Sequence, residues 1–247
     1  MYFKTNTMKN FIYSILSVTT SFSISFTYSQ SDSLPKNEIM AALAGTIIST
    51  YSKVYLPTHP SKKYYISQFT HDSNNYKLFR QLLDETEMSL QDFEIDTYVG
   101  DSYKIDHLYS KKYFKKLHTH YEFKKAKDKW YDQDLDKEYK LKFGTIDTTK
   151  FSSKSEKLAF LIGLFSLYGE FEEKDSDEKV LSYRFAPDQD RFKKVQTFLN
   201  QTGSRIQSAC YYGDRIPGGM HIFFKPSEEF LNLLEKFDIQ ENDRDIP

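Results

Sequence analysis

The sequence contains a single cysteine, Cys210, among 247 residues, together with one tryptophan, nine glycines and seven prolines. One cysteine excludes an internal disulfide and any zinc site built from several thiolates. The six histidines form no HExxH-type spacing. Lysine and arginine number 34 and aspartate and glutamate 35, which gives a net charge of −1. Any nucleic-acid role must therefore rest on a local basic face and not on bulk charge.

Aromatic residues are abundant, with 21 phenylalanines and 19 tyrosines in a chain that is 39% hydrophobic. This composition fits a globular protein with an aromatic-rich core and does not fit a disordered or a transmembrane chain. The length allows one large domain or two half-sized ones.

The first 31 residues contain no acid, two lysines, many hydroxyl residues and an apolar run over residues 11–18 that is too short to span a membrane. Such a segment is read as a targeting sequence outside the fold. Its acid-poor, hydroxyl-rich character favours a mitochondrial presequence. The basic start, the apolar centre and the small Ser29 before Gln30 also suit a secretory signal, so secretion stays open as the alternative address.

Three pairs of segments match at nearly one offset and in one order. Residues 38–56 match 156–173 at an offset of 118, residues 75–83 match 191–199 at 116, and residues 102–117 match 219–234 at 117. The chain is therefore predicted to hold two copies of one unit.

Each copy is predicted to have the order α-β-β-α-β-β-α, which makes the fold class α+β. The first helix is apolar almost all round, and the second, near 74–84 and 188–200, is amphipathic. Strands are predicted at 62–70 and 180–186, and two more follow each amphipathic helix. The predicted bounds are 36–123 for the first repeat, 124–154 for a polar linker and 155–240 for the second repeat.

The motifs "LIGLFSLYGEF" (161–171), "LAGTIISTYSK" (43–53) and "YYISQFTHDSNNYKLFRQLL" (64–83) resemble those of single-chain LAGLIDADG homing endonucleases and the related maturases. The resemblance implies that the two first helices pack at a pseudo-twofold axis, with Gly45 and Gly163 at their interface. It also implies two four-stranded sheets that form a saddle over DNA. Because the two copies already supply the pseudo-dimer, a monomer is expected.

The same resemblance implies a catalytic aspartate at the eighth motif letter of each copy, where two carboxylates hold divalent cations. Those letters are Thr50 and Tyr168 here, and neither side chain is anionic at neutral pH. Only the second copy has acids nearby, Glu170 and Glu172. We therefore expect a degenerate motif without catalytic residues, metal or cofactor.

Residues 110–129 carry eight lysines and two acids. Such a run is usually a solvated helical face, but with interleaved aromatic residues it can also grip a phosphate backbone. Polar residues of the predicted sheet faces are further candidates, because side chains there read bases and phosphates in the family. The candidate nucleic-acid-binding residues are Lys63, Gln68, Lys104, Lys111, Lys112, Lys115, Lys116, Arg184, Arg205, Gln207 and Arg215.

The leading hypothesis is a catalytically inactive, LAGLIDADG-derived protein that binds RNA as a maturase-like splicing or processing factor in mitochondria. Its partner would be an organellar intron or ribosomal RNA, with DNA as the other possibility. One alternative is a structural constituent or assembly factor of the mitochondrial ribosome, in contact with ribosomal proteins. Another is a residual homing endonuclease rescued by Glu170, and a last one is a secreted protein whose repeat is accidental.

Overall fold

The computed structural model describes residues 33–47, 54–57, 64–71, 73–101, 103–132, 136–172, 179–212 and 219–239. The predicted targeting segment lies outside these residues, as do Thr50, Lys63 and Arg215. Within the described part of the chain, no helix is both long enough and apolar enough to cross a membrane.

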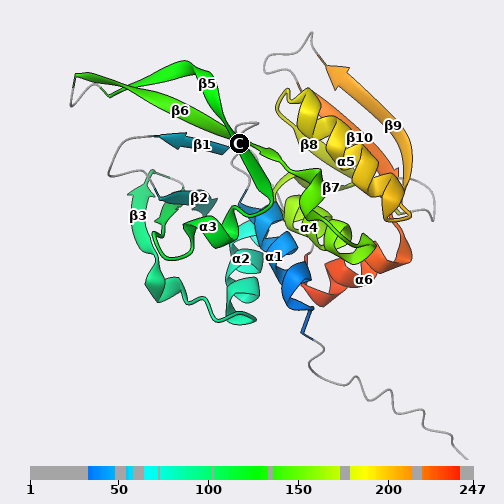
Figure 1. Ribbon diagram of the computed structural model, residues 1–247. Helices are drawn as coiled ribbons and strands as arrows, with labels where there is room; N and C mark the ends of the chain where they lie inside the picture. The colour runs from blue at the N-terminus through cyan, green and yellow to red at the C-terminus, as the bar shows by residue number, and fades with distance from the viewer. Residues whose placement is uncertain are drawn as a thin grey trace, which may run out of the picture. The chain divides into compact units, whose positions relative to one another are not determined.

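The order α-β-β-α-β-β-α occurs twice, which confirms the predicted α+β architecture of two repeats (Figure 1). The first repeat consists of α1 (Lys36–Thr46), β1 (Val54–Pro57), β2 (Tyr65–Thr70), α2 (Asn74–Asp84), β3 (Glu94–Val99), β4 (Lys104–Tyr109) and α3 (Phe114–Leu117). The second consists of α4 (Lys154–Tyr168), β7 (Gly169–Glu172), β8 (Val180–Phe185), α5 (Gln189–Gln201), β9 (Arg205–Tyr212), β10 (Gly219–Lys225) and α6 (Glu228–Lys236). Between them lie β5 (Tyr121–Asp132) and β6 (Lys137–Ile146).

Capping side chains in the sequence determine where the helices begin. The Ser73 hydroxyl accepts a hydrogen bond from the Tyr76 amide at the start of α2, and the Asp188 carboxylate accepts from the Arg191 amide at the start of α5. Ser227 caps α6 in the same way. Such side chains satisfy amides that have no partner within the helix. Gly203, just beyond α5, has a φ of +88°, a conformation that glycine adopts without strain.

The expectation of two four-stranded sheets is correct for the second repeat and wrong for the first. The second sheet has the order β7-β8-β10-β9, whereas the first has only β2-β4-β3. The strand expected as the fourth of the first sheet, β1, pairs with β6 instead, from Val54↔Gly144 to Pro57↔Leu141. It thereby forms the separate sheet β1-β6-β5. The long hairpin after the first repeat offers an unpaired edge, and β1 satisfies it.

A solvated helical face over residues 110–129 is also a wrong expectation. Only α3 is helical there, and β5 follows it, paired with β6 in a hairpin that we call the ribbon (Figure 1). Tyr121 and Phe123 alternate with Glu122 and Lys124, a period of two that indicates a strand and that the lysine content hides. The Tyr121 hydroxyl donates to the Ala44 carbonyl oxygen (2.5 Å), which fixes the base of the ribbon to α1.

Helices α1 and α4 pack against each other and are buried along most of their length. A Cβ atom added to Gly163 would lie 2.1 Å from the Ala42 carbonyl oxygen, and one added to Gly45 would lie 2.3 Å from the Phe160 carbonyl oxygen. The two backbones can approach this closely only because both positions lack a side chain. The glycines that the sequence places at the helix interface thus lie where the two helices meet.

Candidate nucleic-acid interface

The end of α4 carries the motif position where the resemblance implies a metal-binding aspartate, and Tyr168 occupies it. Its hydroxyl accepts a hydrogen bond from the guanidinium of Arg191 (3.0 Å), a side chain that is 4% exposed. The same guanidinium lies 5.3 Å from the centroid of the Tyr168 ring and 3.8 Å from the Asp188 carboxylate. Burial raises the pKa of the Tyr168 hydroxyl, and the nearby Arg191 charge opposes that shift. Tyr168 is therefore a neutral acceptor beside a fixed positive charge.

A second polar contact joins the ends of α1 and α4. The Asn75 side chain donates to the Thr46 carbonyl oxygen (3.1 Å) and accepts from the Ser166 hydroxyl (3.0 Å). Asn75 is the counterpart of Arg191 at the repeat offset of 116. Sequence reasoning missed both residues, although this shared position at the start of the second helix was a signal that could have identified them.

The acids just beyond Tyr168 already have partners. The Arg184 Nε donates to Glu170 (2.6 Å), and one of its terminal nitrogens lies 3.9 Å from Glu172, which also accepts from the Ser182 hydroxyl. Within the described residues, no three His, Cys, Asp or Glu side chains come together as metal ligands. A divalent cation needs several anionic oxygens and would meet the buried guanidinium of Arg191 here, so the side chains at this helix end do not fit the family's metal.

The ribbon gathers lysines on one of its faces. Lys125 lies directly opposite Lys142, and Lys129 directly opposite Lys140. Lys140 and Lys142 are two residues apart on one strand and therefore point to the same side, as do their partners. All four side chains are exposed. We call this set the lysine face; Glu138, which forms an ion pair with Lys129, is the acid among them.

Like charges placed directly opposite each other destabilise a strand pair. The outer part of a two-stranded ribbon has little core of its own to offset this cost. An anion bound between the lysines would remove the repulsion, and a phosphate backbone supplies anions at regular intervals. The lysine face is therefore the strongest candidate phosphate contact among the described residues.

The four candidate lysines around α3 lie on a different side of the first sheet from Gln68. Leu117 of α3 is fully buried in the core, whereas Gln68 lies on the sheet face that points away from it. Lys112 forms an ion pair with Asp92 (2.8 Å). Lys111 and Lys115 are exposed. The α3 lysines and Gln68 therefore cannot form one contiguous contact.

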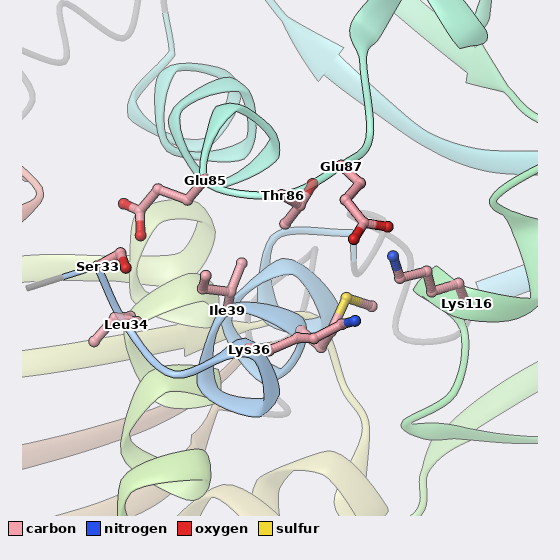
Figure 2. A pocket seen from close by; sticks show the side chains of 9 residues that line it. Ser33, Leu34, Lys36, Ile39, Glu85, Thr86, Glu87 and Lys116 are labelled. Carbon is pink, nitrogen blue, oxygen red and sulfur yellow. The ribbon is translucent and has the colours of Figure 1, made fainter.

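Lys116 lines a pocket of about 290 Å³ between the start of α1 and the residues that follow α2. In Figure 2 its ammonium group points toward the Glu87 carboxylate, and Glu85 extends toward Ser33. Two acids, Glu85 and Glu87, and two lysines, Lys36 and Lys116, thus line this pocket. The mixture of charges makes it a poor phosphate site.

The remaining candidates lie on the sheets. Lys104 is exposed at the start of β4, where its carbonyl oxygen accepts from the His71 amide. Arg184 and Arg205 lie on β8 and β9 of the second sheet, and Gln207 occupies a bulge in β9. Lys63 and Arg215 fall outside the described residues. The second sheet is thus the place where the structure brings several candidates together.

No protein-family model and no curated protein matches the chain. Among solved structures, it is similar to I-DmoI in complex with DNA and manganese, with 18% identity over 83% of this chain and 99% of that one and a TM-score of 0.47. It is also similar to mesophilic variants of the homing endonuclease I-DmoI, with 18% identity over 81% of this chain and 89% of that one and a TM-score of 0.48.

Proposed function

We propose that this protein binds nucleic acid, RNA in particular, and that it does so without the paired-carboxylate metal centre of the homing endonucleases. The observation that carries the proposal is the lysine face, where four exposed lysines gather and Lys125 lies directly opposite Lys142. Contacts to the phosphate backbone and recognition of RNA shape require no metal. Binding therefore does not depend on acidic residues at the motif positions Thr50 and Tyr168.

The finer part of the proposal is a maturase-like splicing or processing role in mitochondria. The acid-poor, hydroxyl-rich segment 1–31 supports that address. Crosslinking of the tagged protein in its own cells, followed by sequencing of the attached RNA, tests this role. Reads concentrated on one organellar intron would support it, whereas reads on ribosomal RNA would support a ribosomal constituent and contradict the splicing role.

Binding itself is tested by removing charge from the lysine face. The double variant Lys125→Gln/Lys142→Gln should bind a structured RNA more weakly than the wild type. The slope of log affinity against log salt should also become shallower by about 1 to 2, because two phosphate contacts are lost. Fluorescence anisotropy over a salt series measures both quantities.

The matched control is Lys193→Gln/Lys236→Gln, which removes the same charge from exposed positions on α5 and α6. This variant should keep the wild-type affinity and slope. If both double variants lose the same affinity, the lysine face has no specific role. If the wild type binds RNA no better than an unrelated protein of equal charge, the proposed function is wrong.

A further inference from the structure

The second sheet has an inward and an outward face. Leu181, Tyr183, Ile222 and Phe224 point inward and are at most 1% exposed. Alternation along β9 and β10 places three aromatic side chains on the opposite, outward face. These three, which we call the ring row, are Tyr212, His221 and Phe223.

The rings of the ring row follow one another closely. The centroids of Tyr212 and His221 are 4.8 Å apart, and those of His221 and Phe223 are 6.0 Å apart. All three side chains are partly exposed. An outward sheet face in contact with water normally carries polar side chains, so a row of rings there is a candidate contact surface.

Positive charge lies at one end of the ring row. Arg205 and Lys225 are exposed and lie directly opposite each other, one step beyond Phe223 on the same face. They form another like-charge pair whose repulsion an anion would relieve. Beside the row, Arg184 lies opposite His221 and forms ion pairs with two carboxylates, Glu170 and Glu172. Arg205 and Lys225 therefore place two exposed positive charges at one end of the ring row.

We propose that the outward face of the second sheet binds unpaired nucleotides, with bases stacked on the ring row and phosphates held near Arg205 and Lys225. Bases in a duplex already stack on one another and present only their edges, whereas unpaired bases have faces that can stack on aromatic side chains. Rings next to cations therefore fit a single-stranded segment better than a duplex groove. This inference rests on the proposed nucleic-acid function and narrows its ligand to unpaired segments.

The first sheet has rings on its outward face as well, but the charge beside them has the opposite sign. The Tyr65 ring lies 5.6 Å from that of Tyr109 and 6.3 Å from that of His107. Glu94 and Asp96 project from the adjacent strand on the same face. Burial and, to a smaller extent, these two carboxylates raise the pKa of Tyr109. Because the carboxylates would repel phosphate, these rings serve as a matched control.

The test compares Tyr212→Leu and Phe223→Leu with Tyr109→Leu. The probes are a labelled oligouridylate, which is single-stranded, and a blunt RNA duplex. Each ring-row variant should bind oligouridylate about tenfold more weakly and the duplex as well as the wild type does, because a stacked base contributes roughly 1–3 kcal/mol. Tyr109→Leu should leave both affinities unchanged.

The stacking proposal is overturned if Tyr212→Leu and Phe223→Leu, each melting at the wild-type temperature, keep the wild-type affinity for oligouridylate. A second readout does not depend on the folding of variants. Photocrosslinking of wild-type protein to oligonucleotides that carry iodouridine should modify Tyr212 or Phe223, as mapped by mass spectrometry. Crosslinks confined to the ribbon would contradict the proposal.

The two proposals can fail separately. If the ribbon variant loses affinity while both ring-row variants retain it, the nucleic-acid function stands and stacking on the second sheet is wrong. If the wild type binds neither probe above an unrelated protein of equal charge, both proposals are wrong.

Discussion

At the residue scale, buried polar side chains of the first repeat hold one another by hydrogen bonds and charge. Asp106, 4% exposed, accepts from Tyr76 (2.9 Å) and Thr97 (2.7 Å) and lies 2.9 Å from the His71 Nε2. Burial works to raise the pKa of this carboxyl, but the three partners together hold it below its ordinary value. A buried charge is tolerated only when it is paired in this way.

His118 is buried among aromatic rings, and among the described residues its Nε2 has no hydrogen-bond partner. It is 4% exposed, its Nδ1 lies 2.9 Å from the Phe114 carbonyl oxygen, and the Phe114 ring lies 4.6 Å away. Burial lowers the pKa of His118 to about 4, and the carbonyl opposes this only partly. The imidazole is therefore neutral at physiological pH.

The pKa of His118 predicts a pH dependence of stability. Its folded pKa lies below its unfolded value of about 6.5, so the unfolded chain binds more protons between these values. The free energy of unfolding should thus fall as the pH drops from about 6.5 to about 4, by an amount on the order of 3 kcal/mol from this residue. Urea unfolding of wild type and His118→Phe across this range measures the difference.

In His118→Phe this part of the pH dependence should vanish, while His120, whose pKa is also lowered by burial, keeps its contribution. Parallel curves for wild type and His118→Phe would contradict the assignment.

At the scale of elements, the opposed lysines of the ribbon lower the stability of its strand pairing. Two lysine pairs face each other across β5 and β6, and Lys129 also forms an ion pair with Glu138. Each opposed pair costs a few tenths of a kcal/mol relative to a neutral one. An element that retains such pairs is less stable than its pairing alone would allow.

Lys142→Glu should therefore raise the free energy of unfolding by about 0.5 kcal/mol, because an opposite charge then faces Lys125. The same change should weaken RNA binding, since a phosphate contact becomes a repulsion. Urea unfolding and anisotropy measure the two effects on one sample. A variant that is more stable and also binds as well as the wild type would show that the ribbon does not contact RNA.

At the scale of the whole molecule, the interface of α1 and α4 joins the two repeats. Most of both helices is buried, and the backbones meet at Gly45 and Gly163. Because neither repeat can cover its first helix alone, the two repeats should unfold in one cooperative transition.

Gly163→Ala should destabilise this interface strongly. The added methyl group would lie 2.1 Å from the Ala42 carbonyl oxygen, a backbone atom that cannot move without separating the helices. We expect a loss of about 3 kcal/mol in the free energy of unfolding, measured by urea denaturation. The control is Gly219→Ala, where the added atom would be 3.5 Å from its nearest neighbour and the expected change is within about 0.5 kcal/mol. Equal losses in both variants would contradict the close helix contact.

The sequence by itself determined the order of elements in both repeats. Helix caps and period-two strands are local signals: Asp188 and Ser227 cap α5 and α6, and Gly203 follows the end of α5. The resemblance implied that Gly45 and Gly163 lie at the helix interface, and the two backbones do meet there. The sequence also showed that the two positions where the resemblance implies an aspartate, Thr50 and Tyr168, are not acidic.

Tertiary structure alone decided which strands pair and which side chains meet. The transfer of β1 to β6 depends on a free edge far away in sequence, and no local signal at Val54–Pro57 shows it. The lysine face exists because the register of the hairpin places Lys125 opposite Lys142. The ring row exists because the pairing of β9 with β10 places Tyr212, His221 and Phe223 on one side of the sheet. The contact of Arg191 with Tyr168 likewise joins two helices. Such contacts are non-local, so a pattern read along the chain cannot determine them.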